Sequence, residues 1–163
     1  MNTFRTISLI GATMTTGLCA GVFLLYAHTI MPGLATFDDL TFDTSFAAID
    51  RAIINPVFMA SAFLGALVLT AAATVAHRGG AAFAVTALAL ALYLATVAIT
   101  VAVQLPLNDA IKQAVAAGGF DPAAVREAFD ASRWQNWNQL RVLTSVGAFG
   151  CLCWALVQHG RSS

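Results

Sequence analysis

The stretch that decides the fold is residues 79–108, GGAAFAVTALALALYLATVAITVAVQLPLN, which contains no Asp, Glu, Lys or Arg. A helix that spans a bilayer needs about 20 predominantly apolar residues, and this stretch is longer than that. Its apolar residues do not alternate with polar ones, as they would in the strands of a membrane barrel. The stretch therefore predicts a transmembrane α-helix, because only helices and closed barrels satisfy their backbone in lipid.

Three further runs without Asp, Glu, Lys or Arg lie at residues 6–37, 52–76 and 142–158. The first is about twice as long as the apolar part of a signal peptide, so we interpret it as a helix that stays in the membrane. The last is extended by the uncharged residues 137–140. We predict an all-α, four-helix membrane bundle in a single domain, residues 1–163, with spans at about residues 7–30, 55–76, 81–104 and 138–158.

The composition of the whole chain agrees with a membrane protein. Charged residues make up 10% of the 163 residues, hydrophobic residues make up 59%, and the mean hydropathy is +0.78. An ordinary soluble domain has about 25% charged residues, so this chain lacks the polar groups that a soluble surface needs. The formal net charge is zero, and the chain has no basic surface of the kind that binds nucleic acid.

The charged residues predict an orientation. Both termini and the turn at residues 77–80 fall on one side of the membrane, and they carry Arg5, Arg78 and Arg161 but no acidic residue. All eight acidic residues fall in two longer loops, at about residues 31–54 and 105–137. The positive-inside rule then predicts cytoplasmic N- and C-termini, in a bacterial plasma membrane, with both longer loops outside.

The two outer loops are expected to be structured. Asp121 and Pro122 form an N-cap and a first helical residue, and they predict an additional amphipathic helix before the fourth span, which could run straight into it. The first loop has enough apolar surface to lie on the bilayer or to pack on the helix ends. That surface comprises Phe37, Leu40, Phe42, Phe46 and Ile49.

Polar side chains are expected to gather at the outer end of the bundle. Helical spacing places His28 near the directions of Gly17 and Gly21, whose GxxxG spacing is typical of helix contacts, so His28 is expected to face inward. Asn55 begins the second span on a face of small residues. The other polar residues expected at this end of the bundle end the third span or begin the fourth: Gln104, Asn108, Asn138 and Arg141. Because polar groups in a membrane are costly, this convergence predicts a pocket, although helix caps and aromatic belts use the same residue types.

Other kinds of site have less support. His28 is predicted on the outer side, and His77 and His159 on the inner side, so a multi-histidine metal centre is not expected. His28 together with Asp109 or another acid remains a conceivable metal site. The three cysteines have no CxxC spacing and are interpreted as packing residues: Cys19, Cys151 and Cys153. No glycine-rich nucleotide loop is present, and we expect neither metal nor another cofactor.

Four short motifs, in this order, resemble a known family: Met31-Pro32-Gly33-Leu34, Ile53-Ile54-Asn55-Pro56, Pro106-Leu107-Asn108-Asp109 and Trp134-Gln135-Asn136-Trp137-Asn138-Gln139-Leu140-Arg141. The chain resembles, over nearly its whole length, the anthrone oxygenase-like family of small four-helix membrane proteins. The resemblance implies an oxidoreductase, specifically a monooxygenase. Its implied reaction is oxidation of a lipophilic anthrone or phenolic compound by O₂, without metal or flavin.

This implied chemistry suggests roles for the polar residues. A base must form the anthrone anion, which can then donate an electron to O₂. His28 is the candidate base because histidine titrates near neutral pH. Asn138 and Arg141 are the candidate catalytic donors to the developing oxyanion. The residues expected to orient or stack on a flat substrate are Asn55, Tyr93, Gln104, Asn108, Trp134 and Trp137.

Two alternatives remain open from the sequence. One is a membrane protein that binds a lipid or quinone without turnover, and the other is a structural subunit of a membrane assembly. The expected partners are the lipid bilayer and, for a catalytic or binding function, a lipophilic aromatic molecule, with O₂ if the protein is an oxygenase. The oligomeric state and the identity of the substrate do not follow from the sequence.

Overall fold

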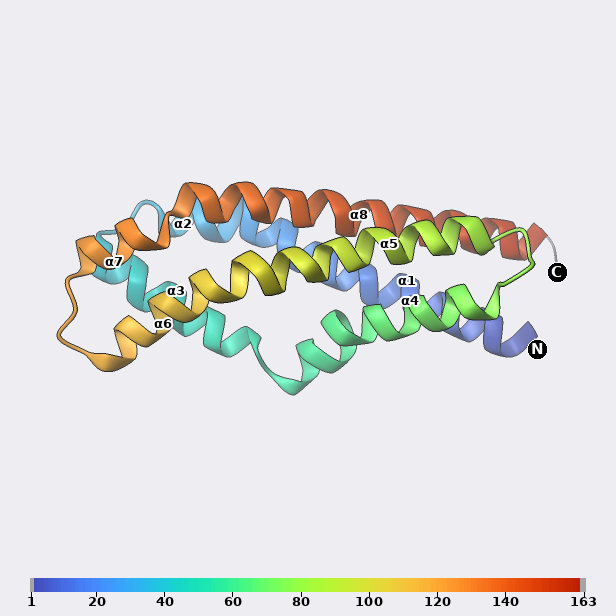
Figure 1. The fold of residues 1–163 in the computed structure, drawn as a ribbon, viewed down its shortest axis with the longest axis horizontal. Helices are drawn as coiled ribbons and strands as arrows, with labels where there is room; N and C mark the ends of the chain where they lie inside the picture. The colour runs from blue at the N-terminus through green and yellow to red at the C-terminus, as the bar shows by residue number, and fades with distance from the viewer. Residues whose placement is uncertain (1, 162–163) are drawn as a thin grey trace.

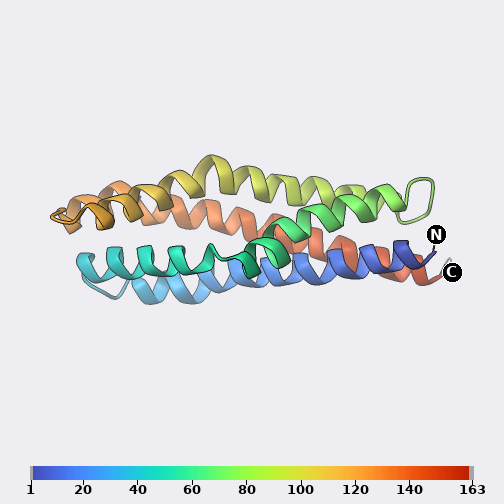
Figure 2. The same ribbon diagram turned by 90° about the horizontal axis from the view of Figure 1, so that it is seen from below.

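The structure, a computed structural model, describes residues 2–161, and these form a bundle of long helices (Figure 1). Four helices are long and apolar enough to cross a membrane: Thr3–Leu34, Phe58–Ala76, Phe83–Ala117 and Pro122–Arg161. The predicted all-α, four-helix membrane bundle is therefore confirmed. Both ends of the described chain lie at one end of the bundle, with the turn that joins α4 (Leu64–Ala76) to α5 (Phe83–Ile99) (Figures 1 and 2). We call this the inner end and the opposite end the outer end.

Three of the long helices contain a π-helical turn. The elements, in chain order, are α1 (Asn2–Leu25), η1 (Tyr26–Ile30), α2 (Met31–Leu34), α3 (Asp39–Ile53), η2 (Phe58–Phe63), α4 (Leu64–Ala76), α5 (Phe83–Ile99), η3 (Thr100–Gln104), α6 (Leu105–Ala117), α7 (Pro122–Phe129) and α8 (Ala131–Arg161). In each π turn the backbone N–H reaches five residues back instead of four, which changes the direction of the side chains that follow.

Two hydrophobic cores lie one after the other along the bundle. In the inner half, α1 packs on α4 and α8, and α5 packs on α4 and α8, through small buried residues such as Ala66, Ala89 and Ala148. In the outer half, α3 packs on α6 and α7 around aromatic rings, and the Phe46 and Phe129 centroids are 4.7 Å apart. The first outer loop is thus helical and packs on the helix ends.

Large apolar side chains are exposed along the inner half, as a lipid-facing surface requires. Examples on all four long helices are Ile7, Met14, Val68, Leu88, Leu143 and Val157. At its outer limit the band includes Leu25, Ile54, Val101 and Trp137, while Phe37 and Leu40 near the start of α3 lie outside it. The surface and the four long apolar helices together identify an integral membrane protein.

The third and fourth long helices differ from their predicted limits. The third continues through Pro106 to Ala117. Pro106 is the second residue after η3, where the changed hydrogen-bond register accommodates a residue that cannot donate a backbone bond. The Asp121 carboxylate accepts from the Ala123 N–H, which confirms the predicted N-cap. The helix that it starts leads into the fourth long segment, Pro122–Arg161, with a one-residue break at Asp130, which adopts a φ of 48° between α7 and α8.

Asp43 is an acidic residue buried in the core of the outer half. Within the described residues neither of its carboxylate oxygens has a hydrogen-bond partner. Burial raises the pKa of Asp43 from 3.8 to about 6, Arg126 lowers it in part, and Asp39 adds to the increase. Between about pH 4 and pH 6 the folded protein therefore holds a proton that the unfolded chain releases. The stability from this proton is complete below pH 4 and is lost as the pH rises through 6.

Asp43→Asn is expected to raise the free energy of unfolding at pH 7.5 by about 2–3 kcal/mol, because a shift of one pKa unit corresponds to about 1.4 kcal/mol. Thermal unfolding in detergent at pH 5 and pH 7.5 measures the effect. The natural protein should be less stable at pH 7.5 than at pH 5, and the variant should lose most of this difference. Glu127→Gln, on the exposed side of α7, is the matched control. An unchanged pH dependence in Asp43→Asn would contradict the assignment.

Candidate functional site

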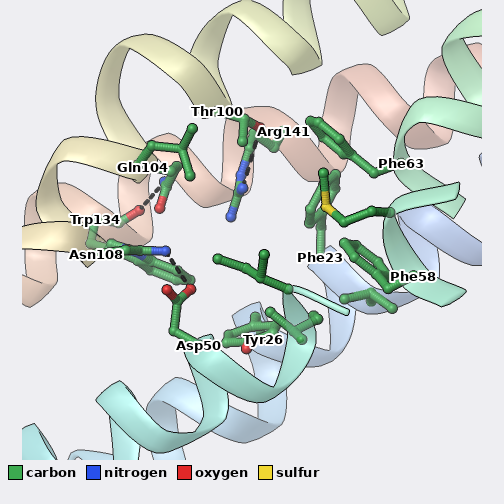
Figure 3. A pocket seen from close by; sticks show the side chains of 15 residues that line it. Phe23, Tyr26, Asp50, Phe58, Phe63, Thr100, Gln104, Asn108, Trp134 and Arg141 are labelled. Carbon is green, nitrogen blue, oxygen red and sulfur yellow. Dashed lines mark hydrogen bonds between the residues drawn. The ribbon is translucent and has the colours of Figure 1, made fainter. Parts of the chain in front are cut away.

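A cavity of about 290 Å³ lies where the two halves of the bundle meet (Figure 3). This volume is near the lower end of the range of roughly 300–1,000 Å³ found for small-molecule sites. Each π turn contributes to the wall: Tyr26 comes from η1, Phe58 from η2, and Thr100 and Gln104 from η3. Single π turns within α-helices occur frequently at functional sites, and here three of them surround one cavity.

Most of the cavity wall is apolar or aromatic. The apolar side chains that line it are Val22, Phe23, Ile53, Ile54, Phe58, Met59, Phe63 and Leu105. Ile54, which belongs to the exposed apolar band, is also part of the wall. The cavity therefore lies at the outer limit of the lipid-facing surface, a position that suits a flat lipophilic molecule with one polar edge.

Arg141 provides a buried cation in this apolar cavity. The residue is 6% exposed, and its guanidinium points into the cavity (Figure 3). Nη2 donates to Asn138 Oδ1 at 2.7 Å, and Nη1 lies 3.4 Å from Thr100 Oγ1. The guanidinium carbon also lies 4.3 Å from the centroid of the Phe23 ring. Rings and neutral oxygens thus hold the cation without neutralising it.

No carboxylate in the described chain forms an ion pair with Arg141, and its Nε has no hydrogen-bond partner there. Burying an unpaired charge is costly, and the cost falls when an anion enters beside it. Asn138 fixes the guanidinium from behind, because its Nδ2 donates to the Phe23 carbonyl at 3.1 Å while its Oδ1 accepts from Arg141. An arrangement of this kind has the chemistry to bind an anionic oxygen.

Asp50, on α3, provides a carboxylate on another part of the same wall (Figure 3). Its Oδ1 accepts from Asn108 Nδ2 at 2.7 Å, and its Oδ2 lies 2.8 Å from Lys112 Nζ. Lys112 also pairs with the exposed carboxylate of Asp109 at 2.9 Å. Asn108 is held in turn, because its Oδ1 accepts from Trp134 Nε1 at 2.7 Å. Asp50 is therefore a carboxylate that Asn108 holds in place and that is shared with one lysine.

Two further polar atoms of the cavity wall are buried without a partner in the described chain. They are the hydroxyl of Tyr26 and Oε1 of Gln104. The amide of Gln104 cannot turn freely, because its Nε2 donates to the Trp134 carbonyl at 3.1 Å. Buried polar groups normally have partners, so both atoms indicate that a polar ligand group or water completes the site.

Three residues that spacing predicted to converge do line the cavity together: Gln104, Asn108 and Arg141. Trp134, which was predicted to stack on a flat substrate, lines it as well. Asn138 lies directly behind Arg141. The predicted inward orientation of His28 is wrong, because its side chain is exposed and its Nδ1 lies 2.6 Å from Thr29 Oγ1. The cause lies in α1, where Gly17 packs on Phe149 but Gly21 faces open space, so the glycine stripe continues away from the core.

Three other predicted residues lie outside the cavity. Asn55 caps the start of η2, since its Oδ1 accepts from the Phe58 N–H at 3.0 Å. Tyr93 is fully buried in the inner core, and its hydroxyl donates to the Phe63 carbonyl at 2.8 Å. Trp137 is 37% exposed and belongs to the exposed apolar band. Asn55 and Tyr93 therefore support the helices that form the cavity wall.

Sequence reasoning missed Asp50 and Tyr26. A signal for Asp50 was present, because the apolar face of α3 also carries Asp43 and Asp50, seven residues apart, and both are buried. An acidic residue on the apolar face of an amphipathic helix is unusual enough to mark a candidate site. Nothing in the pattern around Tyr26 distinguishes it from the other apolar and aromatic residues of the first span.

The family model described as anthrone oxygenase matches residues 43–151. The chain belongs to the anthrone oxygenase family. The matched range contains Asp50, Asn108 and Arg141, and it covers the whole polar part of the cavity wall except Tyr26. No curated protein and no solved structure matches this member of the anthrone oxygenase family. Within residues 2–161, no group of three or more His, Cys, Asp or Glu side chains is placed to hold a metal ion.

Proposed function

We propose that this member of the anthrone oxygenase family is a membrane monooxygenase that oxidises an anthrone-like phenolic compound with O₂. The observation that carries the proposal is Arg141, a buried guanidinium in a mostly apolar cavity, with no ion-paired carboxylate among the described residues. The anion of a hydroxyanthrone is flat and lipophilic, and its charge is concentrated on oxygen. Such an anion fits both the apolar wall and the unpaired cation.

The proposed reaction converts an anthrone and O₂ into an anthraquinone and water. Asp50 removes a proton from the CH₂ group of the ring, and Arg141 stabilises the negative oxygen of the resulting enolate. The enolate passes one electron to O₂, and the two radicals combine at the ring carbon. Protonation by Asp50 gives a hydroperoxide. Removal of the second ring proton then breaks the O–O bond, forms the new carbonyl and releases water.

The other residues of the cavity hold these two groups and the substrate. Asn138 orients Arg141, and Asn108 with Lys112 orients Asp50. We propose that the unpartnered oxygens of Tyr26 and Gln104 bind hydroxyl groups of the substrate. Because His28 is exposed and does not line the cavity, the proposal gives the role of base to Asp50 instead.

We propose a bacterial plasma membrane as the location, with both chain ends in the cytoplasm. The arginines Arg5, Arg78 and Arg161 lie towards the inner end, where no acidic residue occurs in the adjoining sequence. In this orientation the cavity opens near the outer face of the membrane. A lipophilic substrate would then reach it from the bilayer or from the outer interface.

Oxygen uptake by the purified protein tests the proposed function. Chelator-treated protein in detergent is mixed with 1,8-dihydroxyanthrone, and O₂ consumption and quinone absorbance are recorded against detergent alone, because the compound also oxidises slowly by itself. We expect one O₂ consumed per quinone formed, well above the uncatalysed rate, with no accumulation of H₂O₂. If the protein binds the quinone but does not increase O₂ uptake, it is a binding protein and not an oxygenase. If it neither binds the quinone nor increases O₂ uptake, the assignment of the site is contradicted.

A further inference from the structure

Two histidines that the proposed reaction does not use meet at the inner end of the bundle. His77 follows α4, and His159 lies in the last turn of α8. Nε2 of His77 and Nδ1 of His159 are 3.4 Å apart, and the ring centroids are 5.2 Å apart with the planes nearly perpendicular. Two nitrogens of separate helices therefore face each other across a short gap.

The orientation of His77 is fixed by its other nitrogen. Nδ1 lies 2.8 Å from the carbonyl oxygen of Ala73, which can only accept a hydrogen bond. Nδ1 therefore carries the proton, and the lone pair of Nε2 is directed towards His159. The ring is 3% exposed, so it has little freedom to turn away.

His159 is anchored in the same manner. Its Nε2 lies 2.9 Å from the hydroxyl oxygen of Thr6 on α1, which can accept the Nε2 proton. In that tautomer the lone pair of His159 Nδ1 faces the lone pair of His77 Nε2. Histidines that bind metal ions almost always give their remote N–H to a carbonyl, carboxylate or similar acceptor, and both rings have such a partner here.

The distance between the facing nitrogens also fits a shared metal ion. In the other tautomer of His159, Nδ1 would donate to His77 Nε2, and the 3.4 Å separation would make this a long hydrogen bond. Two nitrogens that bind one tetrahedral Zn²⁺ ion at about 2.0–2.1 Å lie roughly 3.3–3.4 Å apart. The gap is thus wide for a direct hydrogen bond and suitable for an ion between the rings.

We propose that His77 and His159 form a binding site for a divalent transition-metal ion such as Zn²⁺, with water at the remaining positions. Nearby arginines do not occupy the gap. Arg5 Nε donates to the Ala76 carbonyl at 2.7 Å, and the guanidinium of Arg161 lies over the Trp154 ring. The ion would join the ends of α4 and α8 to each other and, through Thr6, to α1. An ion that binds only the folded protein stabilises it by mass action.

Metal titration of the full chain tests this site. The protein carries an affinity tag without histidine, is stripped with chelator in detergent at pH 7.5, and is titrated with Co²⁺ followed by visible absorption and with Zn²⁺ followed by calorimetry. We expect saturable binding of one ion per chain, a Co²⁺ spectrum typical of tetrahedral coordination, and a higher Tm with Zn²⁺. Acidification should release the ion, because the ligands must be unprotonated.

Single-residue variants show whether the metal ion binds at His77 and His159 or at another histidine, and whether a loss of binding comes only from a change in folding. His159→Gln, which is half-buried, should weaken binding at least tenfold, and Thr6→Val should weaken it by about 10–100-fold through loss of the remote partner. His28→Gln, at the outer end, should bind as the natural protein does. If His77→Gln fails to fold, His159→Gln still tests the site, because His159 is only half-buried. Absence of saturable binding, or equal binding by His159→Gln and the natural protein, would overturn the proposal.

Discussion

Replacing Arg141 by methionine is expected to lower kcat for oxidation of 1,8-dihydroxyanthrone by two to three orders of magnitude, while the protein still folds. Arg141 is the only cationic side chain among the described residues that line the cavity. Removing one preorganised donor to a developing oxyanion typically costs about 10²–10³ in kcat. Methionine is unbranched and apolar, and replacing a buried charge by an apolar side chain is often neutral or stabilising.

Two variants control the Arg141 experiment. Arg133→Gln removes an exposed positive charge from the first turn of α8 and should leave kcat unchanged. Arg141→Lys retains a positive charge but loses the fixed geometry that Asn138 and Thr100 give the guanidinium, so its kcat should lie between those of the natural protein and Arg141→Met. Activity within threefold of the natural protein in a folded Arg141→Met variant would contradict the assigned role.

The position of Arg141 could be predicted from the sequence because α8 is a regular helix. Asn138 and Arg141 are three residues apart in an element that is continuous from Ala131 to Arg161, so helical spacing places them on one face. The same reasoning failed for His28, because it assumed that the glycine stripe of α1 faces the core. The buried stripe instead contains Ala12, Thr16 and Cys19.

The π turns explain much of the remaining difference between the helices predicted from the sequence and those in the structure. They depend on contacts between helices, and the local sequence gives little sign of them. Gly65 shows this, because a β carbon there would collide with the Ala60 carbonyl oxygen, yet a single glycine in an apolar helix is not a recognisable signal. Pro106 led to the prediction that the third span ends near it. The π turn η3 lies just before Pro106, and the helix continues past the proline. Tyr26 and Thr100 therefore reach the cavity from helices whose local shape was not predictable.

Asp50 was missed for a different reason. Its helix, α3, lies in a segment that the charge pattern correctly placed between two spans, so the segment was considered as a loop or a surface helix. The structure packs α3 on α6, and this brings Asp50 to the level of the cavity beside Asn108 and Lys112. Prediction of this contact requires knowing that α6 extends beyond Pro106, where the π turn η3 changes the hydrogen-bond register.

Asp50→Asn is expected to lower kcat by about 10²–10⁴-fold, the usual contribution of a positioned general base. The amide keeps an oxygen that can accept from Asn108 Nδ2, so the wall of the cavity should retain its shape. The variant also removes one partner of Lys112, and this second effect needs a control. Asp109→Asn removes the other carboxylate of the same lysine, from an exposed position, and should leave kcat nearly unchanged.

The pH dependence separates catalysis by Asp50 from a structural role. If Asp50 removes the proton, the rate of the natural protein should depend little on prior ionisation of the substrate, because the carboxylate itself supplies the base. The residual activity of Asp50→Asn should instead increase with pH, because hydroxide or the pre-formed substrate anion then replaces the base. Rates are measured by oxygen uptake from pH 5 to pH 9, with Tm recorded at each pH. A parallel pH profile in both proteins would show that Asp50 only positions Asn108 and Lys112, and the base would have to be another group of the cavity.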